Sequence, residues 1–568
     1  MDIRKFFKGT LKRKKESSSE SDEEKKIERS LSQNSLAQAG SSKVENIPED
    51  KDVCCNDLGK WVGRTSLMTT SQKLDMLKRC WVPPESYDFV KDAEAANLKL
   101  IFCGTHDLPL RGKENHEGIL EDLLILRIES GEQDLKQHLQ YGKKNAMYTS
   151  PQIQNEIIDL CGLVVKNEII QVVKKAYAYS VMADESCDIA GKEQLSIGIR
   201  FYDESKNMIR EEFLGFVELI AMDANTIASE IDKFLENAGL EPDRCIGQGY
   251  DGCSTMAGSI GGVQKKLREK YKKALYFYCA SHRLNLVVND LNQVPEIRNT
   301  IAKYSGILEP VANALQSKTI DMYTCTNHIK RIISVIKDHR GNADRESQNI
   351  LDISYRTAAA IGTDLQIPRT VGRQQHRSNH PAESVCDFWK RSVIIPYLDS
   401  LISALEQRFS NDHLPAFSLM SLHPSSMLNM KLVDFKEKSQ DFCQYYDLPL
   451  FEHEAELWYK LWKDKGKQSE DLEKLDFTDV LKEANTFFPA TRKAIIISLS
   501  QPCTTSNIER SFSTLRRVKT WFRSTMTENR LNGLCMLSVH RKIVKEKKEI
   551  VQEVLKRFCE EPRRLIVK

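Results

Sequence analysis

The chain has 568 residues with 40% hydrophobic and 29% charged side chains, a composition that excludes a fibrous repeat and is ordinary for a globular protein with several domains. A formal net charge of +3 means that any affinity for nucleic acid must come from local patches. Fifteen scattered cysteines without a secretory leader indicate free thiols in a reducing, intracellular compartment, and apolar runs such as 495–499 are too short to span a bilayer.

The N-terminal segment predicts a disordered leader. Residues 10–48 are rich in Ser, Glu and Lys and have few apolar side chains to bury. The basic cluster 12–15 (KRKK) is typical of a nuclear import signal, although it also fits one half of a mixed-charge tail. Ile3, Phe6 and Phe7 have the spacing of the short plug that binds the sliding clamp of DNA replication, without the expected preceding glutamine. A sticky end of the tail is the alternative interpretation.

Residues 61–172 show mainly helical periodicity. Their cysteines do not make a four-ligand zinc site, because Cys80 is isolated and Cys103-Gly-Thr-His106 is a single half-site. The adjacent Cys54 and Cys55 precede this region and do not complete one. We therefore expect no zinc finger.

A mixed sheet is predicted between residues 177 and 279, because apolar residues alternate at period two in three consecutive runs and shorter runs follow between helices. The first helix has Asn225 as its expected cap and Gly239 at its end. The predicted elements are strands 177–184, 195–203 and 213–219, helix 226–238, strand 245–252, helix 262–271 and strand 275–279.

Two aspartates lie at strand ends in this pattern. Asp184 ends the first strand and Asp251 follows the fourth, and the order β-β-β-α-β-α-β is that of a ribonuclease-H-like sheet, in which these strands are neighbours. Paired carboxylates suit hard divalent cations that hold both oxygens of a phosphodiester exchange. Glu509, on a predicted helix 258 residues downstream of Asp251, is the candidate third acid.

Cys279 and His282 form a C-x-x-H pair at the end of the fifth strand. Two ligands do not make a tetrahedral zinc site. On spacing alone we expect a packed cysteine and a helix-capping histidine.

The C-terminal region carries two apolar stripes at helical spacing. The first is expected to cover part of the sheet, and the second is the better candidate for a partner surface. The first stripe is Ile508, Phe512, Leu515 and Val518, and the second is Leu531, Leu534 and Leu537.

Basic residues follow the first stripe on adjoining faces and either contact phosphates or form a solvated face. They are Arg510, Arg516, Arg517, Lys519 and Arg523.

Four motifs together resemble the transposases of the hAT superfamily, and in particular the host proteins derived from them in the repressor-of-the-inhibitor-of-the-protein-kinase and MYM-type zinc-finger groups. The resemblance covers about residues 95–290 and 485–540. It implies that Asp184, Asp251 and Glu509 form a metal-binding triad for Mg²⁺ or Mn²⁺, and that about 487–539 is a dimerisation region. The motifs are MADESCDIAG (182–191), GYDG (249–252), CASHRLN (279–285) and SNIERSFS (506–513).

The chain also departs from the family. It has no N-terminal zinc finger before residue 93 and no tryptophan between His282 and Trp389, where relatives have an Arg-Trp pair that stacks on a flipped base. Trp389 has the surroundings of a core aromatic, so we do not transfer that role to it. The helical insertion looks shortened, and residues 367–380 form a basic polar loop.

These features predict an α/β protein, with a ribonuclease-H-like mixed sheet interrupted by an all-helical insertion. We expect either a domesticated or defective nuclear transposase that regulates by binding DNA or protein, or an active metal-dependent transposase. A kinase-pathway adaptor is a third class that follows only from analogy with one relative group. In both main alternatives the partner is a second copy or a related hAT protein. The expected segments are the leader (1–60), the helical N-terminal region (61–172), the first part of the core (173–300), the insertion (301–484), the end of the core with the dimerisation region (485–545) and a charged tail (546–568).

Overall fold

The computed structural model describes residues 99–111, 118–141, 150–292, 301–360, 362–364, 366–367, 382–409, 415–466, 469–484, 486–547 and 549–560. All of them belong to one compact unit, Val82–Lys568. The predicted leader, the clamp-like motif Ile3, Phe6 and Phe7, the basic cluster 12–15 and Cys54, Cys55 and Cys80 lie outside the described residues.

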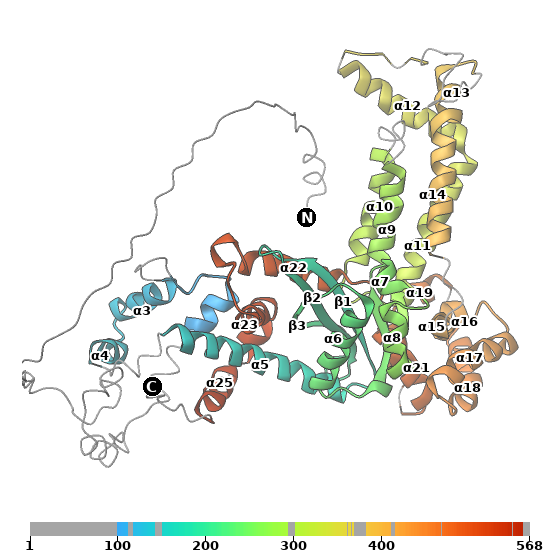
Figure 1. Ribbon diagram of the computed structural model, residues 1–568. Coiled ribbons are helices and arrows are strands. Elements are labelled where there is room, and N and C mark those ends of the chain that lie inside the picture. The colour runs from blue at the N-terminus through green and yellow to red at the C-terminus, as the bar shows by residue number, and fades with distance from the viewer. Residues whose placement is uncertain are drawn as a thin grey trace, which may run out of the picture. The chain divides into compact units, whose positions relative to one another are not determined.

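A five-stranded mixed sheet forms the centre, with the strand order β3-β2-β1-β4-β5 (Figure 1). The first three strands are antiparallel neighbours, as a meander requires, whereas β4 and β5 run parallel to β1. The predicted α/β class and the five strands are confirmed. The strands are β1 Tyr179–Cys187, β2 Glu193–Asp203, β3 Met208–Leu219, β4 Cys245–Tyr250 and β5 Leu275–Tyr278.

Two local predictions were wrong. Strand β1 continues three residues past Asp184 to Cys187, because Glu185, Ser186 and Cys187 still pair with β2. Helix α6 (Ala224–Asn237) is capped by Asp223, whose carboxylate accepts the backbone N–H groups of residues 225 and 226. A carboxylate at this position satisfies N–H groups that have no partner within the helix, so Asp223 takes the role predicted for Asn225.

Alternate residues of β2 face two different cores, as the period of a strand requires. Leu195, Ile197 and Ile199 belong to one hydrophobic cluster. Residues of α5 (Pro151–Lys175), α6, α8 (Val263–Lys270), α22 (Ser506–Val518) and α23 (Glu528–Val539) belong to the same cluster. Tyr202 belongs to the other, which contains residues of the insertion helices and of α21 (Pro489–Ser500). Both faces of the sheet are therefore covered by helices.

Helix α5 (Pro151–Lys175) and helix α23 (Glu528–Val539) pack closely against each other. They meet at two glycines, since a Cβ on Gly162 would lie 2.7 Å from the Cα of Gly533. The predicted partner surface on this helix was wrong, because its three leucines are buried against the chain's own helices and sheet. Leu531, Leu534 and Leu537 are all at most 5% exposed.

The C-terminal residues include a helix instead of only a charged tail. Helix α25 (Glu549–Glu560) packs on α5. Its apolar residues recur at helical spacing within a highly charged sequence, which explains why a tail was predicted. The buried ones are Ile550, Val554, Leu555 and Phe558.

The insertion is helical, as predicted. It contains a tight aromatic core around Trp458 and Trp462, whose rings meet edge to face at 5.8 Å. Trp389 is half-buried and packs against Phe388 in the same manner, as expected for a core aromatic. Its elements are α10 Ile301–Leu315, α11 Met322–Gly341, α12 Ala343–Ala360, α13 Val385–Trp389, a π-helical turn Lys390–Ile394, α14 Ile395–Arg408, α15 Pro415–Ser418, α16 Pro424–Met427, α17 Leu432–Tyr446, α18 Phe451–Asp464, α19 Ser469–Glu473 and α20 Phe477–Glu483.

The remaining helices lie before, between and after the strands in the chain. Within the described part of the chain, no helix is long and apolar enough to cross a membrane. These helices are α3 Ile119–Glu129, α4 Gln133–Tyr141, α7 Ser254–Ala257, α9 Ala280–Asn292, α21 Pro489–Ser500, α22 Ser506–Val518 and α24 Arg541–Glu546.

Candidate acidic site at the sheet edge

Asp184 lies half-buried on β1, opposite Ser196 of β2. Its Oδ1 accepts the backbone N–H of Glu185 at 3.1 Å. Burial, followed by the nearby carboxylates of Glu509, Glu185 and Asp251 in that order, raises the pKa of Asp184 to about 8. Near neutral pH this carboxyl group is therefore largely protonated in the metal-free chain.

Asp251 directly follows β4, the strand that pairs with β1. Its Oδ1 accepts the N–H of Cys253 at 3.2 Å, and its backbone carbonyl accepts the hydroxyl of Tyr276 at 2.6 Å. The next residue must be glycine, because a Cβ on Gly252 would lie 2.0 Å from the ring of Tyr278. The GYDG motif thus lets the chain turn closely over β5 and fixes the second aspartate beside the first strand.

Glu509 lies in the first turn of α22 and is exposed. This helix is held on the sheet by specific contacts, including a 2.7 Å hydrogen bond between the hydroxyls of Ser511 and Ser196. Gly198 leaves the space that Ile508 needs, since a Cβ there would lie 2.2 Å from the Cδ1 of Ile508. The distant acid thereby comes within electrostatic range of Asp184, as the raised pKa of Asp184 reflects.

The C-x-x-H motif connects β5 with the start of α22. The buried Sγ of Cys279 accepts the N–H of Thr505 at 3.2 Å, and the hydroxyl of Thr505 donates to Glu509 Oε1 at 3.2 Å. Cys279 also accepts the N–H of His282 at 3.5 Å, so the cysteine caps α9. The packed cysteine is confirmed and the capping histidine was wrong, because the imidazole of His282 instead packs against the ring of Tyr278.

Glu185 is an acid of this edge that sequence reasoning missed. Burial, followed by the charge of Asp251, raises its pKa to about 7, and its Oε2 is buried without a hydrogen-bond partner in the described residues. The signal was present as the Asp-Glu pair in MADESCDIAG, but the strand was expected to end at Asp184, which left Glu185 outside it. The edge therefore gathers four carboxyl groups.

The chemistry of these donors fits a hard divalent cation, since all are carboxylate oxygens and a cation would relieve their mutual repulsion. Their positions fit less well, because within the described ranges no three His, Cys, Asp or Glu side chains are placed to hold a metal ion. The four carboxyl groups therefore influence one another's charge, but in the structure they do not form a metal-binding site.

Two families match separate parts of the chain. Residues 100–262, which hold Asp184 and Asp251, match the family described as ZMYM1/FAM200, RNase-like domain. Residues 458–543, which hold Glu509, match the hAT family C-terminal dimerisation region. The chain is related to the hAT transposases.

Two characterised mammalian proteins are similar to this chain over most of its length. The human 52 kDa repressor of the inhibitor of the protein kinase is 23% identical, covering 78% of this chain and 73% of its own length. The mouse protein of the same name is 22% identical with the same coverage. The predicted family is confirmed, and the matched dimerisation region begins earlier than the predicted residue 485.

The basic residues that follow Glu509 do not form one continuous exposed surface, because several of them contact other parts of the chain. Lys519 was wrongly predicted as a phosphate contact, because its ammonium group is buried in an ion pair with Asp188. Arg517 pairs with Asp107 at 2.8 Å, and Arg510 donates to the backbone carbonyl of Gln316 at 2.7 Å.

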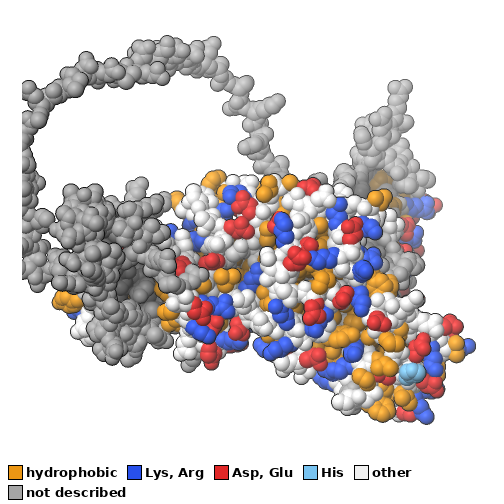
Figure 2. Space-filling view, turned by 60° about the horizontal axis from the view of Figure 1, so that its bottom comes forward, with side chains coloured by type: hydrophobic (Ala, Val, Ile, Leu, Met, Phe, Trp, Pro, Cys, Tyr) orange, Lys and Arg blue, Asp and Glu red, His pale blue; other side chains and the backbone are white. Residues whose placement is uncertain are grey.

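Arg516 is exposed and makes no hydrogen bond or ion pair with another described residue, which leaves it available as a phosphate contact. On the face seen in Figure 2, Lys and Arg side chains alternate with Asp and Glu over the coloured surface. That face offers no single basic patch, in agreement with the nearly balanced charge of the chain.

Proposed function

We propose that this hAT-derived chain is a domesticated nuclear regulator that dimerises through its C-terminal region and binds DNA or another protein. The observation that carries the proposal is an exposed aromatic pair inside the matched dimerisation region. Trp521 and Phe522, between α22 and α23, are 76% and 80% exposed. Large aromatic side chains on a surface mark interaction sites, and tryptophan and arginine are frequent anchors of interfaces.

The aromatic pair is an exposed part of the matched region, unlike its leucines. The leucines of α23 are used inside the chain, and α22 packs on β2 and β3. Arg523 adjoins the pair and donates to the carbonyl of Val518 at 3.3 Å, which helps to fix the turn that presents the two rings.

Two further features support the same proposal. The strand order 3-2-1-4-5 with three antiparallel and two parallel strands supports a ribonuclease-H-like fold, as expected for a hAT-derived core. The human relative is named as a repressor, which supports a regulatory role for this chain. Nuclear import through the cluster 12–15 is tested by fusing residues 1–50 to a reporter, with the basic residues replaced by serine as control. A reporter that stays cytoplasmic contradicts it.

Sedimentation of the full chain tests dimerisation. We expect a dimer at tens of micromolar, and at least a tenfold weaker association for the double variant Trp521→Ser, Phe522→Ser. Ile260→Ser is the matched control, because Ile260 is also highly exposed, at 92%, but lies outside the matched dimerisation region. A wild-type monomer at these concentrations, or a double variant that dimerises like the control, contradicts the proposal.

The second candidate function is metal-dependent cleavage and transfer of DNA strands. The electrostatic coupling of Asp184 to Glu509 and Asp251 favours it. To hold Mg²⁺ or Mn²⁺, these three carboxylates and Glu185 would have to move together from their positions in the structure, and the cation would supply charge stabilisation for the attacking and leaving oxygens. Calorimetric titration of Mn²⁺ into the wild type and Glu509→Gln tests the site. Equal heats in both proteins would exclude a role for the distant acid.

A further inference from the structure

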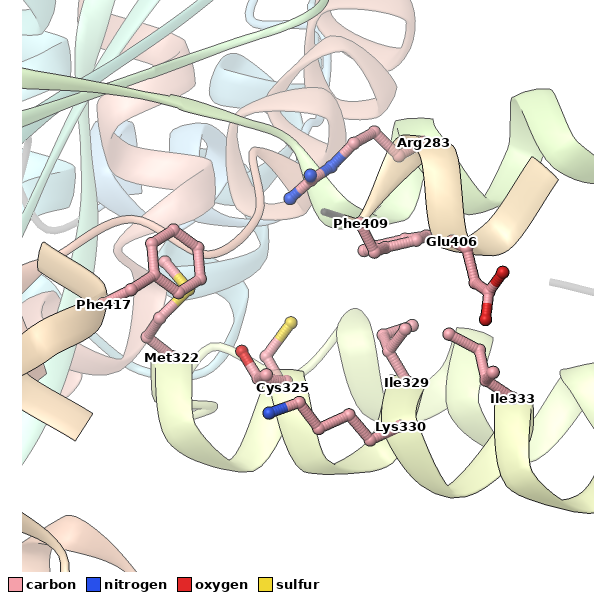
Figure 3. A pocket seen from close by; sticks show the side chains of 10 residues that line it. Arg283, Met322, Cys325, Ile329, Lys330, Ile333, Glu406, Phe409 and Phe417 are labelled. Carbon is pink, nitrogen blue, oxygen red and sulfur yellow. The ribbon is translucent and has the colours of Figure 1, made fainter. Parts of the chain in front are cut away.

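A pocket of about 360 Å³ lies among α9, α11 and α14 (Figure 3). Most of its wall is apolar or weakly polar and comes from one face of α11, opposite the side chain of Arg283. The lining residues are Arg283, Met322, Cys325, Thr326, Ile329, Lys330, Ile333, Glu406, Phe409 and Phe417.

Arg283 is the unusual member of this wall. Its side chain belongs to a residue that is only 7% exposed, and its Nε is buried without a hydrogen-bond partner in the described chain. One terminal nitrogen donates to the carbonyl of Arg408 at 2.7 Å, and the guanidinium lies over the ring of Phe409 at 4.6 Å. No carboxylate among the described residues forms an ion pair with it.

The second buried arginine shows what this chain does when such a charge is structural. Arg200 is fully buried and pairs with Glu211 at 2.6 Å, and it also donates to the carbonyls of Leu499 and Ile320. Buried charges are normally paired in this way, because an unpaired charge loses its hydration without compensation. Arg283 is nearly as buried as Arg200, at 7% exposure, but has no carboxylate partner among the described residues.

The other charged groups of the wall leave it positive. Glu406 pairs with Lys337 at 2.6 Å, so its charge is compensated outside the pocket. Lys330 is exposed at the wall and makes no ion pair with a described carboxylate. An anion that enters therefore meets two uncompensated cations.

We propose that this pocket binds a flat organic anion, with its carboxylate or phosphate on Arg283 and its apolar body between Phe409 and the face of α11. Arginine presents a planar fork of donors that matches both kinds of head group, and the free Nε supplies one of them. The volume is at the small end of ligand pockets, which limits the body to one or two rings. Neither Trp521 nor Phe522 lines this pocket, so the ligand site is distinct from the exposed aromatic pair.

Binding of three probes of one shape to the full chain tests the proposal. We expect 2-naphthoate or 2-naphthyl phosphate to bind at least tenfold more tightly than the neutral isostere 2-naphthamide. Preference between the two anions tells a carboxylate ligand from a phosphate ester. Equal affinity for the neutral probe, or no binding of either anion up to millimolar concentration, overturns the proposal.

Variants separate the site from folding. Arg283→Met should lose at least tenfold in affinity for the anion, whereas Arg331→Met on α11, the helix that forms most of the wall, should not, because Arg331 is directed to Glu473 instead. Since a change at a buried arginine also affects folding, Ile333→Trp is the second variant and fills the pocket with a ring. Retained anion binding in a folded Ile333→Trp protein contradicts the proposal, and sedimentation of both variants as dimers keeps this result separate from the proposed dimerisation.

Discussion

The replacement Asp184→Asn should make the metal-free chain less sensitive to alkaline pH. Asp184 has a pKa of about 8 in the folded chain against an ordinary 3.8, so the folded state holds its proton more tightly than the unfolded state. The free energy of unfolding therefore falls as pH rises between these two values, by at most about 1.4 kcal/mol per pH unit. Between about pH 5.5 and pH 7.5 this amounts to about 2–3 kcal/mol, which the asparagine variant should not lose.

Urea denaturation in the presence of EDTA measures this effect, with Asp243→Asn, an exposed aspartate before β4, as the matched control. Asparagine keeps the acceptor for the N–H of Glu185, so the local hydrogen bond survives the change. The stability difference between the variant and the wild type should grow with pH and stay constant for the control. A difference that does not change with pH, or a wild type that gains stability over this range, would refute the reasoning about the acidic edge.

Two further changes test the packing around the site. Gly162→Ala should lower the free energy of unfolding by about 1–3 kcal/mol, because its Cβ would meet the backbone of Gly533, whereas Gly261→Ala, with open space around it, should not; thermal unfolding of both variants measures this. Glu211→Gln should cost about 3–5 kcal/mol in urea denaturation near neutral pH, because it leaves the buried Arg200 without its carboxylate, and a cost below about 1 kcal/mol would contradict the ion-pair argument.

The sheet could be predicted because the alternation of residue types along its strands matches the alternation of their surroundings. Leu195, Ile197 and Ile199 alternate with Ser196 and Gly198, and in the structure the first set enters a hydrophobic core while the second set contacts α22. Glycine and serine on a strand face thus marked the place where another element approaches closely. The partner itself could not be deduced from spacing, since Ser511 is 315 residues away in the sequence.

The errors have a common physical origin in contacts between distant segments. From its sequence, the leucine stripe of α23 was predicted as a partner surface. In the structure this helix packs against α5, which lies more than 350 residues earlier in the chain. In the same way, the sequence alone does not show that Lys519 pairs with Asp188 inside the fold. Amphipathic spacing identifies a buried face, but it does not identify what buries that face.

Strand cleavage is the measurement that tests the central claim most directly. The purified full chain is incubated with nicked and hairpin DNA in the presence of Mg²⁺ or Mn²⁺, beside Asp184→Asn. A domesticated regulator predicts no cleavage by the wild type above the level of the variant. Metal-dependent cleavage that disappears in Asp184→Asn would contradict this account and establish the chain as an active transposase.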